Sequence, residues 1–166
     1  MAALGAMLLA MVIAIAVLYH DGDKKKESDV ETRYELFQAV PSDAVAMACL
    51  SHLKDVSQPA FSGFKFLASL SDAISQGQFA TLAETPMAFS LHYSGKLAPL
   101  YIFDAGAASP NPSSDASALM EFGRSQGLLS EYLDCSSVID GEGLAKRSLV
   151  IMAETETLLK SSRRHL

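Results

Sequence analysis

The side chains in this sequence that could carry chemistry are few and lie far apart. Its two cysteines, Cys49 and Cys135, each lie in an apolar segment and form no CxxC spacing. The sequence therefore indicates neither a zinc site nor a thioredoxin-type redox pair. Because cysteine is among the most buried residue types, two buried thiols are the first interpretation. A single disulfide, which requires an oxidising compartment, is the alternative.

Two aspartates and one histidine are the next candidates for chemistry. Asp104 ends a predicted strand and Asp140 lies in a predicted turn, so the two could approach each other as a carboxylate pair. Aspartate is also a common turn former, and we expect that role here. His92 falls on the more polar face of a predicted strand, without a nucleophile or carboxylate motif nearby. We therefore expect His92 to be exposed to solvent.

Motifs of the familiar enzyme classes are absent. The sequence has no G-x-S-x-G, H-E-x-x-H, P-loop, G-x-G-x-x-G or Ser-x-x-Lys pattern in a context that would give it chemistry. Its many serines fall in predicted loops and helix starts, where a hydroxyl forms a cap or turn unless a base lies beside it. The sequence thus identifies no catalytic, cofactor-binding or metal-ligating residue. We expect a non-catalytic protein, and a hydrolase whose groups meet only in space is the alternative.

The segment that must position the rest of the chain comes first. Residues 2–19 contain no charged residue, and only Tyr19 has a polar tip. As a helix this run would be about 27 Å long, close to the hydrocarbon thickness of a bilayer, so it predicts a transmembrane anchor in contact with lipid. A signal peptide is the alternative, because Ala14-Ile15-Ala16 has the small-x-small form of a cleavage site. The apolar run continues past that site through Val17 and Leu18, which favours retention.

A charged segment, residues 20–35, follows the apolar run and is expected to be a tether. Its Lys24, Lys25 and Lys26 favour a cytoplasmic side for the body of the protein. The whole chain has a net charge of −6 and no basic stripe. Because nucleic-acid binding requires clustered lysine and arginine, no nucleic-acid partner is expected.

Residues 36–166 are long enough for one domain with a core of its own. Pro41-Ser42-Asp43 has turn chemistry, and the wholly apolar run 44–50 after it predicts a strand buried on both faces, hence central in its sheet. Residues 64–74 show helical spacing of their apolar side chains. The aromatic stripe of Phe61, Phe64 and Phe66 could be a ligand wall, but core packing under the helix is the commoner arrangement.

The second half of the domain repeats a unit made of a hairpin and a helix. Residues 87–93 alternate between apolar and smaller or polar side chains, and with 97–104 they predict a β-hairpin around Ser94-Gly95-Lys96. Ser113 or Ser114 would cap a helix that ends near Gly127. The remaining predicted elements are strands at 132–139 and 148–153, joined by the turn 140–143, and a final helix capped by Thr155.

This order of elements predicts an α+β fold. A mostly antiparallel sheet would have its helices packed on one face, and an N-terminal transmembrane helix would precede it. The predicted organisation is therefore an anchor (1–19), a charged tether (20–35) and an α+β domain (36–166).

Three segments resemble a family of membrane-anchored bacterial proteins of unknown function, found notably among the Bacteroidota. They are the N-terminal apolar run, the Val40-Pro41-Ser42-Asp43-Ala44-Val45 segment that leads into the first strand, and residues 149–159. The resemblance implies an envelope protein that faces the periplasm, is usually longer than this chain, and has no assigned active-site residues. For topology we follow the resemblance rather than Lys24–Lys26.

These observations together predict a membrane-tethered, non-catalytic envelope domain that binds another protein or a surface polymer, or associates with itself. Strand 148–153 is apolar enough to require neighbours on both sides, and the helix after it is too short to be stable without packing. We therefore also expect that the chain is part of a larger protein, or that a partner covers this strand.

Overall fold

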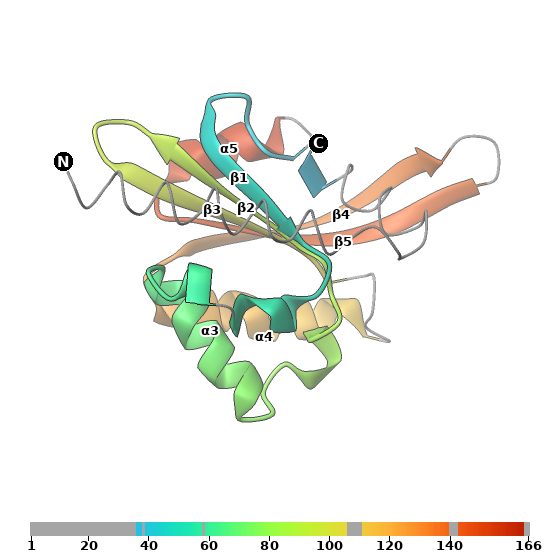
Figure 1. Cartoon of the computed structure of the whole chain (residues 1–166). Coiled ribbons are helices and arrows are strands. Elements are labelled where there is room, and N and C mark those ends of the chain that lie inside the picture. Colours follow the sequence, from blue (N-terminus) through green and yellow to red (C-terminus); the bar gives the residue numbers. More distant parts are fainter. Residues whose placement is uncertain (1–35, 38, 58, 106–110, 140–142, 165–166) are drawn as a thin grey trace, which may run out of the picture.

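The computed structural model describes residues 36–37, 39–57, 59–105, 111–139 and 143–164. Within these ranges the chain forms an α+β body around one five-stranded sheet, which confirms the predicted fold class (Figure 1). The elements in chain order are β1 (Ala44–Leu50), the 3-10 helices η1 (Leu53–Ser57) and η2 (Pro59–Phe61), α3 (Lys65–Ser75), the 3-10 helix η3 (Ala80–Leu82), β2 (Met87–Tyr93), β3 (Leu97–Asp104), α4 (Pro112–Ser125), β4 (Leu129–Ile139), β5 (Gly143–Ala153) and α5 (Glu156–Arg163).

Neighbouring strands of the sheet are antiparallel, and their order is β1-β2-β3-β5-β4. The predicted hairpins are both present, as β2–β3 and β4–β5. In the first of them Gly95 has φ 85°, a left-handed conformation that glycine adopts at little cost. The prediction of a mostly antiparallel sheet is therefore confirmed.

β1 lies at one edge of the sheet, because β2 is its only partner among the described strands. The prediction that this strand is central was wrong. Val45 is 55% exposed and Met47 is 47% exposed, whereas Ala48 and Leu50 are buried. The run resembled a doubly buried strand because it contains three alanines, which are apolar but too small to require a covered face.

β5 has the neighbours that the sequence analysis expected a partner to supply. Its residues Leu149–Ala153 pair with β3 on one side and with β4 on the other, and all of them are buried. The expectation that this strand needs cover from another chain was therefore wrong. β3 fills the place.

Helices cover both faces of the sheet rather than one, which corrects the prediction (Figure 1). On one face, Leu67 and Leu70 of α3 and Leu119 of α4 belong to the larger hydrophobic core. On the other face, Leu158 of α5 belongs to a second core, together with Leu36 and other buried residues of the sheet. Successive strand residues contribute to alternate cores, as the pleat requires. Periodicity reveals that a helix has a buried face, but not which side of the sheet that face covers.

The helix ends are set by local residues. Gly77 follows α3 with φ 82°, as predicted. α4 begins at Pro112, and Asn111 before it makes no side-chain cap bond. The predicted cap by Ser113 or Ser114 was wrong, because proline already occupies the first helical position, which it favours. The predicted cap of α5 is confirmed, since Thr155 Oγ1 accepts from Leu158 N at 3.4 Å.

The β4–β5 hairpin extends beyond the rest of the sheet as a two-stranded arm (Figure 1). β5 pairs with β3 only over Leu149–Ala153, whereas its pairing with β4 continues to Gly143, opposite Ile139. The part of β4 that contains Cys135 therefore lies on this arm.

Several predictions concern residues outside the described ranges. They are the anchor at 1–19, the tether at 20–35 and the turn residues 140–142. Within the part of the chain that the structure describes, no helix has the length and hydropathy needed to cross a bilayer.

Candidate functional site

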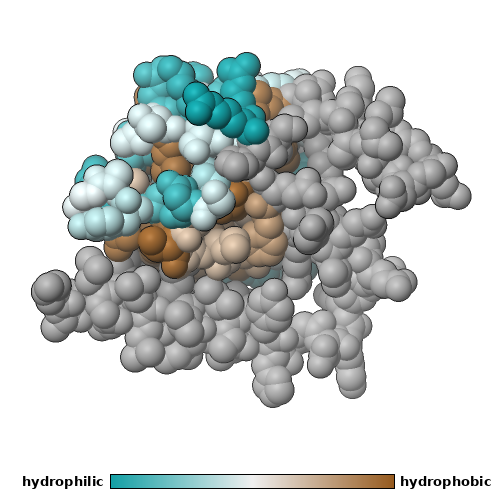
Figure 2. All heavy atoms as spheres, turned by 90° about the horizontal axis from the view of Figure 1, so that it is seen from above, coloured by the Kyte–Doolittle hydropathy of each residue, from teal (hydrophilic) through white to brown (hydrophobic). Residues whose placement is uncertain are grey.

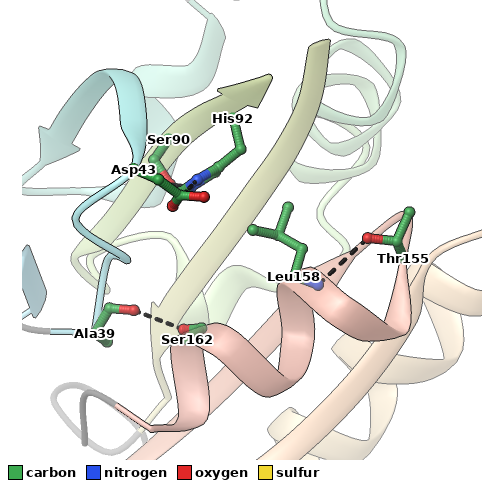
Figure 3. A network of polar contacts seen from close by, with 7 residues as sticks. All are labelled: Ala39, Asp43, Ser90, His92, Thr155, Leu158 and Ser162. Atoms are coloured by element: carbon green, nitrogen blue, oxygen red, sulfur yellow. Dashed lines mark hydrogen bonds and ion pairs between the residues drawn. The ribbon is translucent and has the colours of Figure 1, made fainter. Parts of the chain in front are cut away.

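Three polar side chains meet on the α5 face of the sheet, near its β1 edge (Figure 3). Ser90 Oγ lies 2.9 Å from His92 Nε2, and His92 Nδ1 lies 2.9 Å from Asp43 Oδ1. Because an ionised carboxylate can only accept, His92 donates from Nδ1 to Asp43, and in the neutral imidazole Nε2 then accepts from the Ser90 hydroxyl. These contacts form the Ser90–His92–Asp43 relay.

Strand geometry brings the relay together. Ser90 and His92 are two residues apart on β2, so their side chains point to the same face of the sheet. Ala44 of β1 lies opposite His92, which places the preceding Asp43 beside the imidazole ring. His92 is only 4% exposed. The prediction of an exposed histidine without a nearby carboxylate was wrong.

The relay has the atom connections of a Ser-His-Asp catalytic triad. In a triad the aspartate is buried and the serine meets the substrate, whereas here the serine is buried and the aspartate is exposed. Ser90 is 0% exposed, whereas the side chain of Asp43 is 74% exposed. A serine nucleophile must reach a substrate carbonyl, and donors must lie where the oxyanion forms. A fully buried Ser90 cannot meet a substrate in this conformation. The geometry fits a relay that satisfies polar groups at the edge of the second core.

The two cysteines lie on opposite edges of the sheet, Cys49 in β1 and Cys135 in β4. Four strand spacings of about 4.8 Å each separate these edges, so the two edge strands lie about 19 Å apart. A disulfide requires the two Cα atoms to lie within about 7 Å of each other. This fold is therefore incompatible with a bond between the two cysteines of one chain. Cys49 is partly buried.

The other predicted sites bring no chemistry together. Asp104 is 2% exposed at the end of β3, and its proposed companion Asp140 lies outside the described residues. Among the described residues no group of three or more histidine, cysteine and acidic side chains is placed to hold a metal ion.

The aromatic stripe packs into the core, as expected. The rings of Phe64 and Phe89 are 4.6 Å apart between centroids, and those of Phe66 and Tyr101 are 4.7 Å apart. Phe61 meets Phe89 edge-on at 6.5 Å. Through these aromatic contacts, η2, the residue before α3 and the first turn of α3 pack against β2 and β3.

β1 presents two exposed apolar side chains near the relay, Val45 and Met47. Met47 lies opposite Ser90 in the register of β1 and β2, and Val45 lies at an irregularity between Ala44 and Ala46. No residue of β1 is charged. Seen from the α5 side, hydrophobic surface adjoins hydrophilic surface (Figure 2). The surface formed by Val45, Met47 and the outer edge of β1 is called the β1 edge below.

No protein-family model, curated protein or solved structure matches this chain. The envelope-family resemblance therefore rests on its three sequence segments and stays a prediction.

Sequence reasoning missed Asp43 and Ser90 as partners of His92. The i, i+2 spacing of Ser90 and His92 was a usable signal, because it places both side chains on one face of a strand. Asp43 carried no such signal, since only the pairing of β1 with β2 brings it near. A turn aspartate just before a strand has many other common roles.

Proposed function

We propose that this chain is a membrane-tethered, non-catalytic binding module. Residues 2–19 would anchor it in lipid, residues 20–35 would act as the tether, and the β1 edge would bind a protein partner. Following the envelope-family resemblance, the body would face the periplasm. The exposed, uncharged β1 edge is the observation that carries the binding proposal.

An apolar edge strand is a liability unless something covers it. The outer backbone N–H and C=O groups of an edge strand can pair with an extended segment, and natural proteins usually protect such strands with charged residues or proline. β1 has neither within Ala44–Leu50. Val45 and Met47, 55% and 47% exposed, add exposed apolar side chains to this strand. A partner that supplies an extended strand would satisfy the backbone groups and cover both side chains.

Site-specific photo-crosslinking in native membranes tests this proposal. A photoreactive residue replaces Met47 in the full-length chain, and a matched control replaces the exposed Ser117 on α4. The expected result is a discrete adduct with another protein from position 47 and none from position 117. An adduct of twice the chain's mass would show that the partner is a second copy of this chain. Equal patterns from both positions would contradict the proposal.

A hydrolase is the second candidate, and the relay is the observation that favours it. Because Ser90 is 0% exposed, we expect a fluorophosphonate probe, which labels activated serines, to leave Ser90 unmodified. Any ester hydrolysis by the purified chain should be unchanged in Ser90→Ala. Labelling at Ser90 that disappears in Asp43→Ala would establish the hydrolase instead.

A further inference from the structure

A cavity of about 270 Å³ lies on the α3 and α4 side of the sheet. Strands β2 and β3, the first turn of α3 and the segment after α4 surround it. Its walls are largely apolar, formed by Phe64, Leu91, Leu97, Pro99 and Leu128. Neither the relay nor the β1 edge contributes a residue to it.

Tyr101 provides a polar group inside this apolar cavity. The residue is 2% exposed, and its ring is held between Phe66 and Phe89, with centroid distances of 4.7 and 5.5 Å. Tyr101 lines the cavity, and no described residue forms a hydrogen bond with its hydroxyl. Burial raises the pKa of Tyr101, and the nearby Glu154 carboxylate raises it further, so the hydroxyl remains a donor. Without a partner among the described residues, this hydroxyl can donate to a ligand in the cavity.

The charges around the cavity favour an anion. Lys65 lines it from the first turn of α3, and no described residue forms an ion pair with Lys65. α3 has no side-chain cap at Phe64 and no acidic residue in its first turn, so the positive end of its dipole is uncompensated locally. The one carboxylate in the lining, Glu154, is already paired with Lys96 at 2.9 Å.

We propose that this cavity binds a small carboxylic acid with an apolar body. The carboxylate would accept from the Tyr101 hydroxyl and lie near Lys65 and the start of α3, while the apolar body would fill the space between the walls. At about 30 Å³ for each water molecule, the volume corresponds to roughly nine waters, which sets the size of the ligand. The C-terminal residue of a peptide has the same chemistry, but the volume favours a free acid.

Ligand-observed saturation-transfer NMR tests the site in the full-length chain held in phosphatidylcholine nanodiscs. The probes are phenylacetate, its neutral amide and the cation phenethylamine, and the tripeptide acetyl-Gly-Gly-Phe represents a peptide C-terminus. Phenylacetate should bind at least tenfold more tightly than phenethylamine and than the tripeptide. Equal or tighter binding of phenethylamine would overturn the anion assignment, and tighter binding of the tripeptide would overturn the free acid.

Two variants locate the binding. Tyr101→Phe keeps the ring and removes the donor, so phenylacetate should bind about three- to tenfold more weakly. Lys65→Gln changes an exposed residue that the core does not need, and it should reduce the preference for phenylacetate over the amide. Tyr93→Phe, at an exposed tyrosine outside the lining, is the matched control and should change nothing. Unchanged phenylacetate binding in Lys65→Gln and in folded Tyr101→Phe would overturn the proposal.

Discussion

Removing members of the relay one at a time should destabilise the fold in the order of their burial. In Ser90→Ala, Nε2 of His92 loses its donor in a region where His92 is 4% exposed and Ser90 is 0% exposed. An orphaned buried acceptor costs about 1–3 kcal/mol, and we expect a loss in that range. In Asp43→Ala, water can replace the carboxylate, because the Asp43 side chain is 74% exposed. The expected loss there is only about 0.5–1.5 kcal/mol.

Urea denaturation of the full-length chain in nanodiscs, followed by far-UV circular dichroism, measures both losses. Asp43→Asn is the matched control, since the amide oxygen can still accept from Nδ1, and it should cost less than Asp43→Ala. The double variant Ser90→Ala with Asp43→Ala should be non-additive, because both partners act through one imidazole. A larger loss in Asp43→Ala than in Ser90→Ala would refute the reasoning from burial. Additive losses would show that the relay is not one unit.

Three further predictions concern the core, the pH dependence and the anchor. In Gly123→Ala the added Cβ would lie 2.6 Å from Met152 Sδ. The variant should lower stability by about 1 kcal/mol in thermal denaturation, because overpacking outweighs the gain in helix propensity. An unchanged or higher melting temperature would contradict this packing. The raised pKa of Tyr101 means that the folded state keeps its proton above the unfolded pKa near 10. The contribution of Tyr101 to the free energy of unfolding should be fully present below about pH 10. Above that pH the free energy of unfolding should fall by up to about 1.4 kcal/mol per pH unit. The fall should be shallower in Tyr101→Phe, and parallel curves for the two proteins would disprove the assignment. Finally, the protein should remain in the membrane pellet after an alkaline carbonate wash, whereas a soluble form that begins near Val17 would establish a signal peptide.

Local patterns predicted the individual elements because their causes are local. Alternation in 87–93 and the turn at Gly95 identified the β2–β3 hairpin, and Thr155 identified the start of α5. Each of these features depends on residues within one turn or one strand. They required no knowledge of the neighbouring elements.

The arrangement of the elements was less predictable, because it depends on contacts between distant segments. Alanines allowed β1 to resemble a central strand, although a small side chain fits at an edge equally well. β5 was recognised as requiring two neighbours, and the predicted hairpin supplied β4, but the sequence did not show that β3 would be the second. The relay depends on the register that sets Ala44 opposite His92, and a shift by one residue would place Asp43 elsewhere.

Affinity purification of the full-length chain from native membranes tests the central proposal most directly, with wild type compared to Met47→Lys. Lysine on an edge strand disfavours the pairing of another strand, so a protein that co-purifies with wild type should be lost from Met47→Lys. Tyr93→Lys changes a residue of β2 that is 62% exposed and is not part of the β1 edge, and it should retain the partner. The same proteins recovered in equal amounts with Met47→Lys and wild type would contradict the account.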